Sequence, residues 1–238
     1  MSSEARAGPR VGPIVLVALF VTALVTAQLT ASKVLAVDIP VALPVTGDEL
    51  VLPGAALAYS VTFLASDCYA ELYGRRATTV MVNVAFGMNF VLLALVWSTI
   101  LAPVGPGSVD PGAFRTVLGS GTNIVLASLV AYLVSQNWDV FAFHWIRQRT
   151  AGAHLWLRNI GSTATSQALD TVLFVALGFN LVPRLIGIGP VLGLDALAAL
   201  IVGQYLLKLA IALADTPVVY AVVRGIRRVD HRGGPATA

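Results

Sequence analysis

The fold is decided first by residues 11–32, which read VGPIVLVALFVTALVTAQLTAS. These 22 residues lie between Arg10 and Lys33 and carry no charge. At a rise of about 1.5 Å per residue they form a helix about 33 Å long, enough to cross a hydrocarbon core of roughly 30 Å. We therefore predict a first transmembrane helix. A cleaved signal peptide is the alternative, but its apolar region usually has only about 7 to 15 residues.

The composition extends this prediction to the whole chain. The 238 residues are 57% hydrophobic and only 11% charged, whereas soluble domains carry about 25% charged residues. A soluble fold of this size would need more polar side chains to solvate its surface. The single cysteine, Cys68, excludes an internal disulfide. We therefore predict an integral membrane protein stabilised by helix packing in the bilayer.

Five further segments are long and apolar enough to cross the membrane. They are, approximately, Leu50–Gly74, Ala77–Leu101, Gly119–Trp145, Arg158–Val182 and Asp195–Val223. We predict an all-α bundle of six transmembrane helices over residues 1–228. The polar, glycine-containing residues 229–238 are expected to form a disordered cytoplasmic tail.

Basic residues mark the ends of these segments unevenly. One predicted side of the membrane has eleven of them: Arg6, Arg10, Arg75, Arg76, Arg147, Arg149, Arg158, Arg224, Arg227, Arg228 and Arg232. The opposite loops contain only Arg115 and Arg184. Because Lys and Arg near span ends favour the cytoplasm, we predict cytoplasmic termini and a multi-pass protein of the plasma membrane. Membrane lipid is an expected partner, and nucleic acid is not.

Seven charged residues lie inside or near the predicted spans, where a central charge costs about 2.5 to 3.5 kcal/mol. They are Lys33, Asp67, Glu71, Asp139, Asp170, Lys208 and Asp215. Asp67 and Glu71 are four residues apart and share one helix face. Intramembrane charges usually face the bundle interior and mark a site or pathway. Structural ion pairing is the alternative for each carboxylate taken alone.

The last predicted span has a polar stripe. Gln204, Lys208 and Asp215 fall on one narrow helix face. Pro217 follows and removes a backbone hydrogen bond one turn back. This suits a broken helix that lines a transporter cavity, or alternatively a simple packing kink.

A short pattern recurs in the fourth and fifth spans. The two copies are Ser135, Gln136, Asp139 and Phe143, and then Ser166, Gln167, Asp170 and Phe174. In each copy the Gln, Asp and Phe lie at i, i+3 and i+7, on one helix face. Two such faces meeting would form a pocket of amide and carboxylate acceptors beside aromatic rings, although chance could also explain so short a match. On the third span, Asn83 could line a cavity or form an interhelical amide contact.

The motifs of common enzymes and metal sites are missing from the sequence. There is no G-x-S-x-G, H-E-x-x-H or phosphate-binding glycine loop. The three histidines are not paired at the spacing of metal ligands. We therefore expect no enzyme activity, no metal and no cofactor.

Two longer runs identify a family resemblance. S-D-C-Y-A-E-L-Y-G-R-R-A, from Ser66 to Ala77, and W-L-R-N-I-G-S-T-A-T-S-Q-A-L-D-T, from Trp156 to Thr171, resemble two signatures of the queuosine precursor transporters, also grouped as vitamin uptake transporters. The Asp-Thr-Pro at residues 215–217, behind Lys208, resembles a third. The resemblance extends over most of the chain.

The resemblance implies import of 7-deazaguanine bases, namely 7-cyano-7-deazaguanine and its 7-aminomethyl relative, for tRNA modification. The candidate substrate-binding residues are Asp67, Glu71, Asn83, Gln136, Asp139, Arg158, Asn159, Gln167, Asp170, Lys208 and Asp215. An alternative is a substrate-binding membrane subunit of a vitamin-type ATP-driven importer, and a third class is an intramembrane enzyme. A homo-oligomer is left open.

Overall fold

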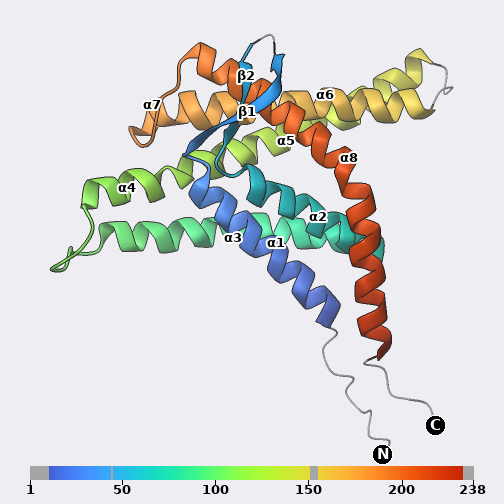
Figure 1. Ribbon diagram of the computed structural model, residues 1–238, viewed down its shortest axis with the longest axis horizontal. Helices are drawn as coiled ribbons and strands as arrows, with labels where there is room; N and C mark the ends of the chain where they lie inside the picture. Colours follow the sequence, from blue (N-terminus) through green and yellow to red (C-terminus); the bar gives the residue numbers. More distant parts are fainter. Residues whose placement is uncertain (1–10, 44, 151–154, 233–238) are drawn as a thin grey trace, which may run out of the picture.

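A computed structural model describes residues 11–43, 45–150 and 155–232, and it is predominantly helical (Figure 1). The main helices are α1 (Val11–Thr30), α2 (Ala56–Tyr73), α3 (Arg75–Leu101), α5 (Gly121–Arg149), α6 (Leu155–Ala176) and α8 (Leu194–Arg232). The short α4 (Pro111–Gly119) precedes α5, and the π-helical turn η1 (Leu177–Leu181) leads from α6 into α7 (Val182–Ile186).

Five helical segments in the described part of the chain are long and apolar enough to cross a membrane. They are Val11–Thr30, Arg75–Leu101, Pro111–Arg149, Ile160–Ile186 and Leu194–Ile211. The charged α2 is 18 residues long, or about 27 Å, and it packs against α1, α3 and α8. The predicted helical membrane bundle is thus confirmed.

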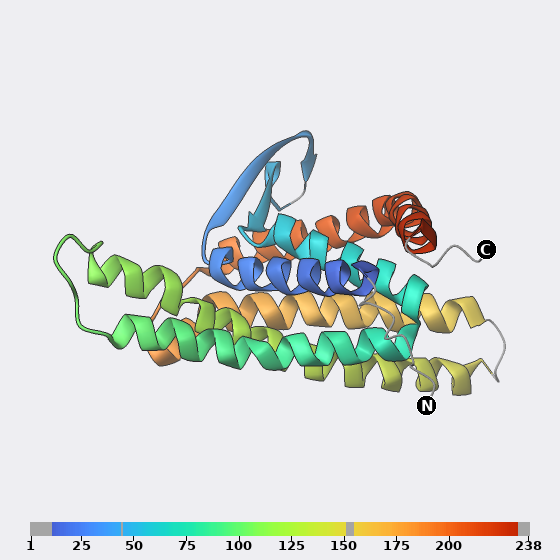
Figure 2. The same cartoon turned by 90° about the horizontal axis from the view of Figure 1, so that it is seen from below.

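The second predicted span begins later than expected, because a β-hairpin precedes it. Strands β1 (Val34–Leu43) and β2 (Gly47–Pro53) are antiparallel, with Val34 opposite Pro53 and Asp38 opposite Glu49. Residues 50–53, predicted as the start of a helix, therefore belong to β2, and α2 starts only at Ala56. The hairpin projects from the side of the bundle (Figure 2).

The hairpin is anchored where β2 crosses α8. A Cβ atom on Gly203 would collide with the backbone carbonyl of Val51, so only glycine permits this close approach. A Cβ atom on Gly54, just after β2, would likewise collide with the carbonyl oxygen of Thr30 at the end of α1. The hairpin thus packs against the end of α1 and the first third of α8, next to the start of α2.

The packing is typical of a membrane bundle. The largest buried hydrophobic cluster contains Ala27, Ala31, Ala55, Ile124, Val175, Phe179, Leu197 and Leu200. Small residues such as its alanines let helices approach closely. Large apolar side chains such as Leu133, Phe141 and Val84 are instead more than half exposed. Outward-facing apolar side chains suit contact with lipid.

The last helix changes direction along its length (Figure 1). Pro217 lies inside α8 and lacks the amide hydrogen that would bond the carbonyl of Leu213. A proline of this kind is a common cause of a helix bend. The helix packs against β2, α2 and α6, and its part beyond Pro217, which includes Val223, packs against α1 and α2.

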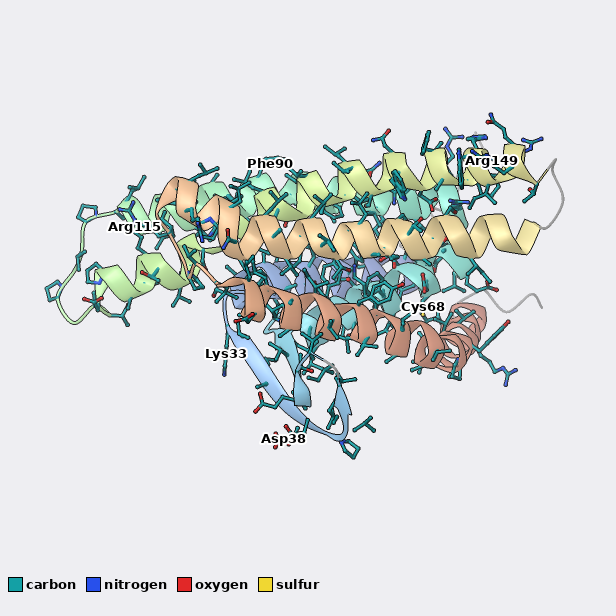
Figure 3. All side chains as sticks on the ribbon, turned by 90° about the horizontal axis from the view of Figure 1, so that it is seen from above. Lys33, Asp38, Cys68, Phe90, Arg115 and Arg149 are labelled. Carbon is teal, nitrogen blue, oxygen red and sulfur yellow. The ribbon has the colours of Figure 1, made fainter. Side chains whose placement is uncertain are left out.

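The basic residues of two predicted loops lie at opposite ends of the bundle. Figure 3 shows Arg149 at one end and Arg115 at the other. If the Arg149 end is cytoplasmic, a Ser108→Cys variant should react with an impermeant thiol reagent in intact cells. A Gln148→Cys variant should react only after the cells are permeabilised. Native Cys68 is fully buried and provides the unreactive background; labelling of Gln148→Cys in intact cells would contradict the predicted orientation.

Candidate functional site

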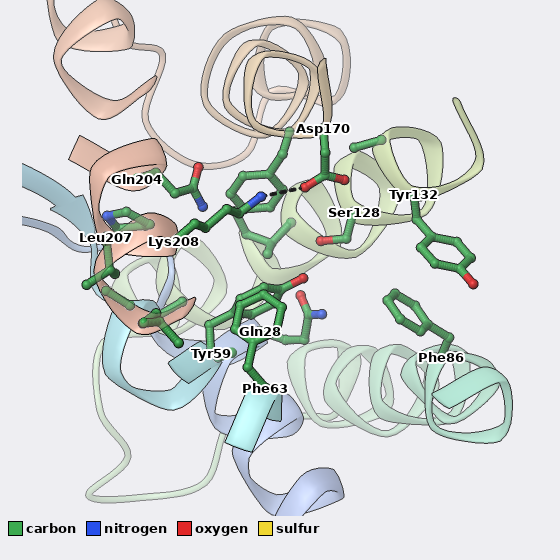
Figure 4. Close-up of a pocket in the computed structure, with 18 residues that line it drawn as sticks. Gln28, Tyr59, Phe63, Phe86, Ser128, Tyr132, Asp170, Gln204, Leu207 and Lys208 are labelled. Carbon is green, nitrogen blue, oxygen red and sulfur yellow. Dashed lines mark hydrogen bonds and ion pairs between the residues drawn. The ribbon is translucent and has the colours of Figure 1, made fainter. Parts of the chain in front are cut away.

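A small cavity lies at the centre of the bundle, between α1, α2, α3, α5, α6 and α8 (Figure 4). Its volume is about 60 Å³, room for roughly four to six water molecules. Its polar lining consists of Gln28, Ser128, Asp170, Gln204 and Lys208, apart from two tyrosines. We call this space the central cavity.

An ion pair joins α6 to α8 across the central cavity. Lys208 Nζ lies 2.8 Å from Asp170 Oδ2 and also donates to Thr171 Oγ1 at 3.1 Å. The side chains of Lys208 and Asp170 are 12% and 23% exposed. Such a pair is stable in a poorly solvated interior because each charge compensates the other. Among the described residues that line this cavity, these two are the only ones with formal charges, and they cancel.

The repeated pattern of α5 and α6 forms a reciprocal contact. Ser135 Oγ lies 3.4 Å from Asp170 Oδ1, and Ser166 Oγ lies 3.3 Å from Asp139 Oδ1. Each serine hydroxyl is therefore within hydrogen-bonding distance of the aspartate of the other copy, and it also contacts a backbone carbonyl of its own helix at a shorter distance. The predicted Gln–Asp–Phe faces meet only in part, because Gln136 is exposed, and of the two aspartates only Asp170 lines the central cavity. This arrangement fixes the orientation of the Asp170 carboxylate.

Aromatic rings form the walls of the central cavity. Phe86 and Tyr132 stack, with ring centroids 5.2 Å apart and an angle of 22° between the planes. Tyr59 and Phe63 meet edge to face, also with centroids 5.2 Å apart. Phe174, from the second copy of the repeat, is a further lining residue. Rings in this setting can hold a flat ligand by stacking.

Two glutamines of the central cavity carry oxygens without partners. Gln28 Oε1 and Gln204 Oε1 are buried and have no hydrogen bond within the part of the chain that the structure describes. Gln204 belongs to the predicted polar stripe of α8, whereas Gln28 was not among the predicted site residues. Its sequence signal was weak, because a neutral amide in an apolar span is less conspicuous than a charge.

A second, more open cavity of about 500 Å³ lies between α2, α6 and α8. Asp67 and Gln167, both predicted site residues, line it. Phe63, Lys208 and Ile211 line both cavities and so stand between them. The ion pair is therefore also next to the boundary of the central cavity.

The other predicted residues lie elsewhere. Asn83, Gln136 and Glu71 are exposed and line neither cavity, and Asp139 is occupied with Ser166. The side chains of Arg158, Asn159 and Asp215 lie outside the described part of the structure, although all three residues are helical. The structure thus brings together Asp170 and Lys208 in one cavity, and Asp67 and Gln167 in the next.

Comparisons with known proteins find similarity to membrane transporters. Residues 53–222 match the model of a family described as "Putative vitamin uptake transporter". A curated relative from Bacillus subtilis (strain 168), named "Probable queuosine precursor transporter", is 31% identical over 169 residues, which cover 71% of this chain and 70% of the relative. No solved structure matches the chain. The family match contains both predicted signature runs, but Gln28 precedes it.

Proposed function

The chain belongs to the "Putative vitamin uptake transporter" family, and from this premise we propose that it imports 7-deazaguanine bases for tRNA modification. The proposed substrates are 7-cyano-7-deazaguanine and its 7-aminomethyl relative. Membership makes the protein a multi-pass transporter of the plasma membrane rather than an enzyme. The name of the Bacillus subtilis relative supports the choice of substrate class.

The central cavity is the observation that carries this proposal. A guanine-type base presents adjacent N–H donors next to a carbonyl acceptor, on a flat ring. A carboxylate accepts hydrogen bonds from such donors, so Asp170, held beside Lys208, can bind one N–H of the exocyclic amine of the base. The rings of Tyr59, Phe86 and Phe174 offer stacking surfaces for the base.

The small volume of the central cavity fits an occluded transporter. At about 60 Å³ it is much smaller than the adjacent cavity of about 500 Å³. In the proposed cycle, movement around Phe63, Lys208 and Ile211 joins the two spaces so that the base can pass. Alternating access of this kind is usual when a site lies between helices of a transporter.

Uptake by cells is the direct test. A host that lacks both deazaguanine synthesis and its own importer should accumulate labelled 7-cyano-7-deazaguanine when it expresses this chain, and should regain queuosine in its tRNA. Cells with an empty vector provide the control. Purified protein in liposomes should transport the base without ATP or another protein. If transport requires an added energising module, the chain is instead the binding subunit of an ATP-driven importer.

A further inference from the structure

The two unpaired glutamines of the central cavity require an explanation. Gln28, on α1, is only 3% exposed, and the oxygens of both Gln28 and Gln204 are fully enclosed. Nearly all buried polar groups in native proteins have a hydrogen-bond partner. An acceptor left unpaired in an apolar bundle lowers stability. Two such acceptors lining one cavity point to a partner that arrives from outside the chain.

No group in the described surroundings of the two amides bonds to these oxygens. Figure 4 shows Gln204 beside Lys208, and Gln28 on the side of the cavity formed by Tyr59. Lys208 Nζ is committed to Asp170 and Thr171. The hydroxyl-bearing lining residues Ser128, Tyr59 and Tyr132 do not bond to either glutamine oxygen, and the remaining lining is largely apolar. The glutamines therefore approach the same space from different helices without bonding one another.

We propose that Gln28 and Gln204 determine substrate specificity by hydrogen bonding the lactam edge and the exocyclic amine of a flat heterocycle. This inference rests on the proposed function and names the residues that recognise the base by hydrogen bonds. A glutamine amide has one acceptor oxygen and an NH₂ donor group. A lactam offers the complementary N–H and C=O side by side, so one amide can form two bonds with it. The second amide then accepts from the exocyclic amine.

This role predicts an unusual response to substitution. Methionine is close to glutamine in length and shape, and it brings no unpaired oxygen. Replacing an unsatisfied buried polar group by an apolar group of similar shape is neutral or stabilising. Gln28→Met and Gln204→Met should therefore keep or raise the thermal midpoint while they lose ligand affinity. A purely structural amide would give the opposite result.

The test measures binding and stability together on the purified full-length chain in lipid nanodiscs. Calorimetry with 7-cyano-7-deazaguanine should show a Kd raised at least about tenfold in each variant, and about a hundredfold in the double variant if the effects are independent. The matched control is Asn89→Leu. Asn89 is 2% exposed and its Nδ2 is also unpaired, but it does not line the central cavity. Its Kd should be unchanged.

A change in the ligand identifies which glutamine bonds the exocyclic amine. The analogue 7-cyano-7-deazahypoxanthine lacks the exocyclic amine, so it should bind the unaltered protein about tenfold more weakly than the parent base. The methionine variant that has lost the acceptor for this amine should bind both compounds equally. Equal discrimination by all variants would overturn the assignment of that bond.

The possible failures are distinguishable. If both methionine variants bind 7-cyano-7-deazaguanine as tightly as the unaltered protein, the inference is overturned and the proposed function stands. If affinity falls only in step with a lower thermal midpoint, the glutamines are structural and the inference is also overturned. If the unaltered protein does not bind the base, the proposed function fails, and the inference with it.

Discussion

Substituting Asp170 by asparagine should abolish uptake and also destabilise the protein, because it leaves the Lys208 ammonium without the carboxylate oxygen now 2.8 Å away. Breaking a buried pair from one side costs about 3 to 5 kcal/mol. We expect about 3 kcal/mol here, at the low end, since Asp170 is 23% exposed. The Lys208→Met variant should be similarly impaired, because it leaves the Asp170 carboxylate without its charged partner.

The double variant Asp170→Asn/Lys208→Met separates structure from function. Removing both charges eliminates the unpaired ion, so the thermal midpoint should return close to that of the unaltered protein. Uptake of 7-cyano-7-deazaguanine should remain undetectable, because neither the charged acceptor nor the charged donor is present. Asp38→Asn, on the exposed hairpin, is the matched control and should retain uptake. Normal uptake by the double variant would reduce the pair to a structural role.

Much of the fold follows from the sequence because the bilayer imposes a simple length rule. The uncharged runs of α1 and α3 predict those helices to within a few residues at each end. The hairpin does not follow from that rule. Its residues 34–53 mix apolar positions with Asp38, Asp48 and Glu49, and its position depends on the close contact of Val51 with Gly203 on a distant helix.

The charged part of the site was predictable, whereas its neutral part was not. Asp170 and Lys208 are costly in a membrane, so their presence alone indicates an interior position. Gln136 shows the limit of this reasoning. It directly follows Ser135, which faces Asp170, but one residue turns the helix by about 100° and leaves Gln136 exposed. Which face of a helix points inward depends on the helices that pack against it, and the hydrophobic periodicity of a single sequence does not reveal these neighbours.

The pairing of Asp170 with Lys208 in the central cavity has a consequence for what drives transport of the base. Asp170 and Lys208 are the charged residues among the described residues lining it, and they are paired. Asp67 lines the adjacent cavity, and Glu71 lines neither. Among the described residues that line the central cavity, no carboxylate is therefore left over from the ion pair to carry a proton with the base. This favours a uniporter, in which only the charge of the substrate responds to the membrane potential.

An imposed potential should therefore separate the two proposed substrates in liposomes that contain only this protein. The aminomethyl base is cationic at neutral pH, and an interior-negative potential draws it inward by about 2.3 kcal/mol per 100 mV. This corresponds to about 50-fold accumulation. The neutral cyano base should equilibrate without accumulating, with or without the potential. Measuring both internal concentrations under a potassium diffusion potential, and then under a pH gradient alone, tests this directly. Concentrative uptake of the cyano base driven by the pH gradient would rule out uniport and would require a proton-carrying residue outside the Asp170–Lys208 pair.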